Sequence, residues 1–185
     1  MTKYIAEIKP LNADKIGTAA HGQATFDLTA DHLTIDITMH DTPANTQHWE
    51  HFHGFPTEKA AQVAGPAQDA NGDGYIDLPE TEPVSGTTMV PFNDDPAAMD
   101  IPNDKYPVAD KNGDYHYTRV VSLADLTKKF KAAFNDTDLN LAQRVVYVHG
   151  VPDSVNLPAT VAGAVGPYDA HVTLPIAAGK IIKVD

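Results

Sequence analysis

Hydrophobic and polar residues alternate in several short stretches of the chain, which is the pattern of strands with one buried face. The alternation covers residues 4–8, where it ends at Pro10, and residues 24–28 and 33–39. Because the link at residues 29–32 is short and polar, the second and third stretches predict a β-hairpin. Short strands at this spacing are typical of an all-β sandwich or barrel.

Further strands are predicted later in the chain, and two helices interrupt them. The segment 56–64 starts with a proline and is followed by Gly65, which predicts a short helix. Ser122 is placed to cap a second helix, whose apolar stripe includes Phe130. The later strands are predicted at residues 115–121, 144–151, 171–176 and 180–184.

Residues 65–115 form a long segment that is rich in Pro, Asp, Asn and Gly. A loop of this length inside a compact domain is usually functional or held in place by other groups. We therefore predict a long acidic loop attached to an otherwise all-β fold.

The composition fits one domain and narrows the kinds of site. The chain has 185 residues, of which 42% are hydrophobic, so it can bury a core as a single domain over residues 1–185. A formal net charge of −12 argues against nucleic acid and anionic membranes as partners. The sequence has no cysteine, so a transition-metal site has to use histidine and carboxylate ligands.

The sequence also gives an expectation about location. No run of 18 apolar residues occurs, so no transmembrane helix is predicted. The N-terminus alternates like a strand and shows no signal peptide, which predicts a cytoplasmic protein. If the chain begins at a mature N-terminus, the same features fit a secreted protein.

The densest group of histidines lies in residues 46–55, TQHWEHFHGF. Side chains two residues apart on a strand point to the same face, so His51 and His53 are predicted to point the same way. Two imidazoles at this spacing suit a soft or borderline metal ion. His48 falls on the opposite face or in the preceding turn. The alternative is a strand rich in aromatic residues and histidine that binds nothing.

A second candidate site lies in the long loop, where residues 69–80 read DANGDGYIDLPE. Oxygen-bearing residues occupy the spacing of an EF-hand calcium loop, and Gly74 stands where that loop turns sharply. The calcium ligands predicted from this spacing are Asp69, Asn71, Asp73, the carbonyl of Tyr75, Asp77 and Glu80.

The residues after this loop differ from those of an EF-hand. Pro79 and Pro83 oppose an exiting helix, so we predict a calcium loop without the usual second helix. The alternative is an acidic turn that holds no ion. A similar sequence starts at Asp110 but lacks the closing glutamate, and we predict a simple turn there.

Three short motifs follow one another along the chain. An H-x-H pair is followed directly by Gly54, a late hydrophobic strand, RVVYVHG, contains His149 near its end, and a small-residue strand, LPIAAGKI, comes last. Near the N-terminus, YIAEIKPLN leads into GTAAHGQATFDL. In this order the motifs resemble the Cu/Zn superoxide dismutase fold and the related CHRD domains, over most of the chain outside residues 56–115. The resemblance implies an eight-stranded Greek-key β-sandwich in which His51, His53 and His149 match the copper ligands of the dismutase.

The chain also departs from that family. The dismutases hold zinc with further ligands in the loop after the H-x-H strand, but here that loop has no histidine before His116. The family's disulfide is impossible, and Pro175 stands at the position of the arginine that guides superoxide. Without that cation, a chain of charge −12 would repel an anionic substrate. Three imidazoles still suit one copper or zinc ion, with His48, His116 or His171 as a fourth ligand or outer partner.

Three functions are consistent with these observations. The first is a metal-binding β-sandwich protein with copper or zinc on three histidines and calcium in the acidic loop. The second is a copper-dependent superoxide dismutase or related redox enzyme, in which Arg119, Arg144 or the lysines would attract the substrate. The third is a non-catalytic structural or interaction domain. Metal ions are the expected partners, and the sequence leaves a homodimer open.

Overall fold

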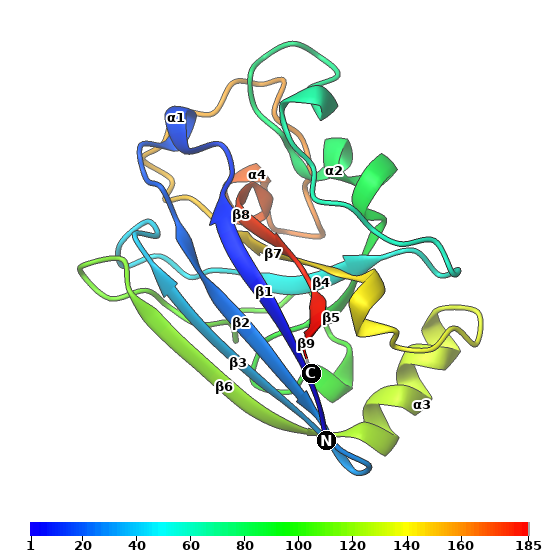
Figure 1. Cartoon of the computed structure of the whole chain (residues 1–185). Coiled ribbons are helices and arrows are strands. Elements are labelled where there is room, and N and C mark those ends of the chain that lie inside the picture. Colours follow the sequence, from blue (N-terminus) through cyan, green and yellow to red (C-terminus); the bar gives the residue numbers. More distant parts are fainter. Residues whose placement is uncertain (185) are drawn as a thin grey trace.

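Strand β1 (Thr2–Pro10) belongs to both halves of the sheet that forms this protein (Figure 1). The computed structural model describes residues 1–184. Residues 2–8 of β1 pair with β2 (His21–Leu28), and residues 9–10 pair with β8 (Pro175–Lys180). The order of the strands is β5-β4-β7-β8-β1-β2-β3-β6, with β9 (Ile182–Val184) paired to β1. The pairings between these strands are antiparallel, so the prediction of an all-β fold is confirmed.

The first half of the sheet contains the long alternating strands that the sequence predicted. It consists of β1, β2, β3 (His32–His40) and β6 (Tyr115–Ser122). Alternate residues of β3, from Leu33 to Met39, are fully buried, while their neighbours are partly exposed. β2 pairs with β3 from His21 to Leu28, which confirms the predicted hairpin.

The second half contains strands that are mostly buried on both faces. It consists of β4 (Glu50–Gly54), β5 (Thr87–Pro91), β7 (Val145–His149) and β8. Every residue of β4 and β7 is buried. This explains why the β7 sequence is almost continuously hydrophobic rather than alternating.

Aromatic side chains connect the two halves in the core. Phe26 of β2 lies with its ring centre 5.8 Å from that of Phe92, which in turn is 6.0 Å from Phe52 of β4. Phe52 packs on Phe130 of helix α3 (Leu123–Ala133) at 6.1 Å. The side chain of Ser122 accepts a hydrogen bond from the backbone N–H of Asp125, so the predicted helix and its cap are confirmed. Helix α3 therefore covers one edge of the core (Figure 1).

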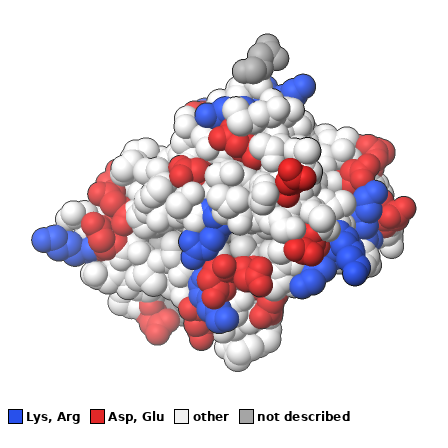
Figure 2. Space-filling model, turned by 90° about the horizontal axis from the view of Figure 1, so that it is seen from below, with Lys and Arg blue, Asp and Glu red and all other residues white. Residues whose placement is uncertain are grey.

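The remaining helical segments are short and lie in the connections between strands. They are α1 (Ala13–Ile16), α2 (Leu78–Ser85), α4 (Ala170–Thr173) and the 3-10 turns η1 (Pro66–Gln68), η2 (Pro96–Ala98) and η3 (Leu141–Gln143). Within residues 1–184, none of the helices has the length and apolar character needed to cross a membrane. On the face seen in Figure 2, acidic and basic side chains are interspersed, with several separate acidic groups.

Two predicted elements outside the long loop were wrong. Residues 56–64 are not helical. The N–H groups of Ala61 and Gln62 donate to the distant carbonyls of Gln143 and Val84, and not to carbonyls four residues earlier as in a helix. His171 lies in α4 rather than in a strand. The side chain of Asp169 accepts a hydrogen bond from the N–H of His171 and thereby caps the helical turn α4.

The long loop also contains more regular structure than predicted, namely β5 and α2. Asp77 caps α2 by accepting from the N–H of Glu80, and the Glu80 carboxylate accepts from the N–H of Asp77. Pro79 lies in the first turn, where a helix needs no N–H donor. The prediction that prolines prevent a helix after the acidic loop was therefore wrong; Pro83 lies inside the helix, which ends two residues later.

Candidate metal centre

Three histidines from neighbouring strands meet in the second half of the sheet. His51 and His53 lie on β4, and His149 is the last residue of β7, which pairs with β4. The ring centre of His149 is 5.2 Å from that of His51 and 5.6 Å from that of His53. One ring nitrogen of each residue lies within 4.8 Å of the others, so the three side chains are close enough to hold a metal ion. No other group of this kind is found among residues 1–184.

Each ring is oriented by a hydrogen bond at its other nitrogen. His149 Nδ1 donates to the carbonyl of Thr173 at 2.7 Å. The Tyr106 hydroxyl donates to a carbonyl, so its oxygen accepts from His51 Nε2, 3.0 Å away. His53 Nε2 lies 3.3 Å from the Thr88 hydroxyl. Outer partners of this kind fix the tautomer and the direction of a metal-binding imidazole.

The nitrogens that remain are buried and have no partner. They are Nδ1 of His51, Nδ1 of His53 and Nε2 of His149. A buried polar atom without a hydrogen bond costs about 1–3 kcal/mol, so three at one place require an explanation. The outer partners of His51 and His149 set the tautomers of these two rings, so His51 Nδ1 and His149 Nε2 carry free lone pairs. A metal ion is the ligand that such lone pairs fit.

Burial keeps the three rings neutral. Burial, followed by the neighbouring His149, holds the pKa of His51 and of His53 well below the usual range. Burial also lowers the pKa of His149 to about 4, although the Thr173 carbonyl opposes the shift. Neutral imidazole is the form that binds a metal, so the protein does not have to release protons here at neutral pH.

The spacing of the three nitrogens suits one ion. Bonds of about 2.0–2.1 Å from a tetrahedral zinc ion place its nitrogen ligands roughly 3.3 Å apart. The separations of the three ring nitrogens, all within 4.8 Å, exceed this spacing by at most about 1.5 Å. Copper and zinc both accept imidazole ligands at such distances, so the site fits either metal.

Two glycines beside the histidines are required by close packing. A Cβ on Gly54 would lie 2.6 Å from Nη1 of Arg144, whose side chain is fully buried and runs past the end of β4. Gly150 has φ = +111°, and a Cβ there would lie 2.8 Å from the carbonyl oxygen of Gln47. Gly54 after β4 and Gly150 after β7 thus allow Arg144 and the backbone of Gln47 to pack closely beside the site.

His48 supports the centre without joining it. It precedes β4 and is buried, and its Nδ1 lies 3.0 Å from the carbonyl oxygen of His149 while Nε2 lies 3.2 Å from that of Pro43. Its ring stacks on Tyr115 at 5.6 Å. Both nitrogens face carbonyl oxygens, and neutral imidazole can donate to one of the two, so His48 lies against the backbone of Pro43 and His149 as an outer residue of the centre.

The other proposed fourth ligands lie elsewhere. His116 is exposed on β6 and its Nε2 is 2.9 Å from Asp36. His171 contacts Asp169 and the carbonyl of Val155. The structure does not bring either histidine into the cluster with His149.

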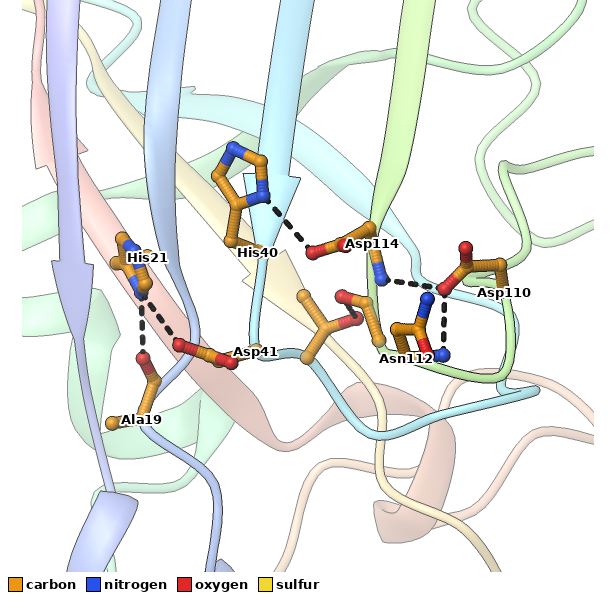
Figure 3. A network of polar contacts seen from close by, with 9 residues as sticks. Ala19, His21, His40, Asp41, Asp110, Asn112 and Asp114 are labelled. Carbon is orange, nitrogen blue, oxygen red and sulfur yellow. Dashed lines mark hydrogen bonds and ion pairs between the residues drawn. The ribbon is translucent and has the colours of Figure 1, made fainter.

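Two further exposed histidines pair with carboxylates at one end of the first half-sheet (Figure 3). His40 Nδ1 lies 2.9 Å from Asp114, and His21 Nδ1 lies 3.5 Å from Asp41. Asp110 accepts hydrogen bonds from the N–H groups of Asn112 and Asp114, so the predicted turn is confirmed.

The acidic loop is closed by its own hydrogen bonds. Asp69 accepts from the N–H groups of Gly72 and Gly74, and Glu80 reaches back to the N–H of Ala70. Further along, Asn71 accepts from Asp73 N–H and Asp73 from Tyr75 N–H. No calcium site is shown by this arrangement.

Asp77 is engaged differently from the other predicted calcium ligands. Its two carboxylate oxygens accept from the N–H groups of Glu80 and Ala162. Burial raises its pKa, against these two hydrogen bonds. Asp77 therefore caps α2 and attaches the 158–165 loop to it.

Sequence reasoning missed Tyr106, Thr88 and Thr173, which orient the histidines. Tyr106 also stacks on Trp49, with ring centres 5.4 Å apart. Tyr147 packs on His53 at 4.8 Å, and its hydroxyl is held by Ser85 and the N–H of Ala64. In the sequence, the only hint of these contacts was the number of aromatic residues near the histidines. That number does not indicate which residues contact the rings.

No protein-family model matches the chain, and no curated protein matches it either.

Proposed function

We propose that this chain is a metal-binding β-sandwich protein in which His51, His53 and His149 hold one copper or zinc ion. The observation that carries the proposal is the set of three buried ring nitrogens without partners, each on a ring fixed from its far side. A copper ion bound there would supply one-electron chemistry, and a zinc ion would act as a Lewis acid.

The fold proposed with this function is the Greek-key sandwich of the Cu/Zn superoxide dismutase and CHRD resemblance. It is supported by the strand order, in which β1 pairs with both halves and long connections join β3 to β4 and β5 to β6. The positions of the histidines on β4 and at the end of β7 agree with that resemblance.

The test is elemental analysis of the dialysed protein after exposure to copper, zinc and calcium together. We expect one tightly held copper or zinc ion per chain. His149→Ala is expected to lose it, while His116→Ala, which removes an exposed histidine from β6, is expected to keep it. Circular dichroism of each variant shows whether it is folded. If the wild type retains no transition metal, the chain is a structural or interaction domain.

A dismutase or related redox enzyme is not favoured by the position of Arg144. Arg144 is fully buried and donates to the carbonyls of Leu139, Phe55 and Asp138. It cannot attract an anion from solvent. Superoxide turnover by the copper-loaded protein that disappears in His149→Ala would nevertheless establish this alternative.

A second proposal is that the acidic loop binds calcium through Asp69, Asn71, Asp73, the Tyr75 carbonyl and Glu80. It is supported by the spacing of these oxygen-bearing residues and by the Glu80 carboxylate, which lies against both ends of the loop. Asp77, the remaining predicted ligand, is committed to the cap of α2 and to Ala162.

Glu80→Gln tests the calcium proposal because glutamine can keep the capping box but removes the charge. We expect calcium to raise the melting temperature of the wild type and not that of Glu80→Gln. A gain that persists in the variant would show that calcium binds elsewhere.

A further inference from the structure

We propose that His21 and His40 form a second, exposed metal site, which takes a divalent copper or zinc ion from solution. This site is separate from the three buried histidines and does not depend on them. The two imidazoles hold the ion as a chelating pair, and water fills the remaining coordination positions. The carboxylates of Asp41 and Asp114 lie behind the two rings.

Strand pairing brings the two histidines together. His21 begins β2 and His40 ends β3, and the register of the hairpin places them directly opposite each other. Side chains at opposite positions of an antiparallel pair point to the same face, with Cβ atoms about 4.5–5.5 Å apart. The ring centres of His21 and His40 are 5.7 Å apart, with 40° between the ring planes. The hairpin therefore holds two imidazoles next to each other at the surface (Figure 3).

This separation is close to that of two rings bound to one ion. With bonds of about 2.0–2.1 Å, the ion lies about 3.2 Å from each ring centre, so the two centres are about 4.5–5.2 Å apart. In the buried cluster, the ring centres are between 5.2 and 6.0 Å apart. The side chains of His21 and His40 are each 50% exposed, and exposed side chains change rotamer readily. Closing the remaining distance thus moves surface groups and leaves the core in place.

Oxygen atoms behind each ring leave the outer nitrogens free. His40 Nδ1 lies 2.9 Å from a carboxylate oxygen of Asp114. His21 Nδ1 lies 3.1 Å from the carbonyl oxygen of Ala19 and 3.5 Å from Asp41. Because these oxygens only accept hydrogen bonds, Nδ1 of each neutral ring carries the proton and Nε2 carries the lone pair. In the described part of the chain, neither Nε2 has a hydrogen-bond partner, and a carboxylate behind the ring is a usual outer partner of a metal-binding histidine.

The backbone at Asp41 brings its carboxylate to the side of His21. Consecutive residues of a strand point to opposite faces, so a residue directly after His40 in regular β-structure would point away from the pair. Asp41 instead has φ = +53°, in the left-handed region that aspartate tolerates better than most residues. Two carboxylates beside the rings, on a chain of net charge −12, raise the local concentration of divalent cations.

The exposed site has two protein ligands and the buried one has three. Among residues 1–184, the three buried histidines are the group whose ligand atoms all lie within 4.8 Å of one another, and neither His21 nor His40 belongs to such a group. A chelate of two imidazoles holds an ion less tightly than one of three. We therefore expect the ion at His21 and His40 to exchange with solvent and to be lost on dialysis, while the buried ion is retained.

The test is a zinc titration followed by nuclear magnetic resonance of the imidazole signals, which reports on each histidine separately. We expect the signals of His21 and His40 to shift together and to saturate with one zinc ion. His21→Gln and His40→Gln should each weaken this binding by about tenfold or more, since removing one of two linked ligands abolishes the chelate effect. If neither signal responds to zinc, the proposal is wrong.

His116→Gln is the matched control. His116 is exposed on the same face of the sheet and its Nε2 lies 2.9 Å from Asp36, but the residue opposite it is Thr38 and not a second histidine. The variant thus removes an equivalent histidine–carboxylate contact without touching the pair. We expect zinc to bind at His21 and His40 with unchanged affinity in this variant. An equal loss of affinity in His116→Gln would overturn the proposal, because the effect would then come from general surface charge.

The same titration separates this site from the buried centre. Shifts of His21 and His40 without shifts of the buried histidines would support the exposed site even if the three-histidine centre binds nothing. Shifts confined to His51, His53 and His149 would refute the exposed site and leave the buried centre standing. Circular dichroism shows whether the glutamine variants are folded.

Discussion

The hydroxyl oxygen of Tyr106 lies 3.0 Å from Nε2 of His51, and its hydrogen is donated to the carbonyl of Ile101 at 2.7 Å. The phenol thus acts as an acceptor for His51 and leaves Nδ1 as the nitrogen with a free lone pair. A residue 55 positions further along the chain decides which nitrogen of His51 can bind a metal.

Tyr106→Phe is expected to weaken metal binding about 10- to 100-fold, as loss of an outer partner typically does. The measurement is competition with a chelator of known affinity. Tyr117→Phe is the matched control, because it also removes a mostly buried hydroxyl that donates to a carbonyl, that of Asn93. An equal loss of affinity in both variants would mean that the effect is one of general stability and not of orientation.

Copper binding should quench the fluorescence of Trp49. It is the single tryptophan of the chain, and its ring centre lies 6.0 Å from that of His51. A nearby copper(II) ion provides efficient energy and electron transfer from the excited indole, whereas zinc(II) has a filled d shell and does not. We expect stoichiometric quenching by copper in the wild type and none in His149→Ala. Quenching that remains in that variant would place the copper outside the three-histidine site.

Gly54→Ala should destabilise the protein, because the added methyl group would lie 2.6 Å from Nη1 and 2.7 Å from Cδ of the buried Arg144. Overpacking of this kind costs about 1–3 kcal/mol, measured as the free energy of unfolding in urea. Gly65→Ala is the control, since a Cβ there has nothing within 4 Å and Gly65 has no positive φ. If the two variants unfold alike, Arg144 can move away at little cost.

His171 should titrate above its usual range. Partial burial lowers the pKa of His171. The carbonyl of Val155 and the carboxylate of Asp169 raise this pKa by more than burial lowers it. A raised pKa in the folded state stabilises the protein below about pH 6.5, and this stabilisation is lost as the pH rises through the folded-state pKa. The effect is small because the side chain of Asp169 is 68% exposed, so solvent screens its interaction with His171.

Nuclear magnetic resonance titration checks this prediction, with Asp169→Asn as the test variant. Asparagine can keep the cap of α4 but carries no charge, so the pKa of His171 should fall. An unchanged pKa would mean that the Val155 carbonyl and the charge of Asp153 are responsible.

The long strands were predictable because their signal is local. In β3, alternate residues from Leu33 to Met39 are buried, and the period of two is visible in the sequence itself. The same holds for α3, whose cap at Ser122 and apolar residue Phe130 follow helical spacing. Elements in the long loop were harder to predict, since α2 depends on a capping box around Asp77 and on Pro79 falling in the first turn.

By itself, the sequence determined that His51 and His53 point to the same face, because alternation on a strand is a local property of the backbone. It also determined that any transition metal would have to use histidine or carboxylate, since there is no cysteine. The tertiary structure decided that His149 completes the group, that His116 and His171 lie apart, and that Tyr106, Thr88 and Thr173 orient the rings. These contacts join residues far apart in the chain, and they arise from strand pairing and burial, which no short stretch of sequence records.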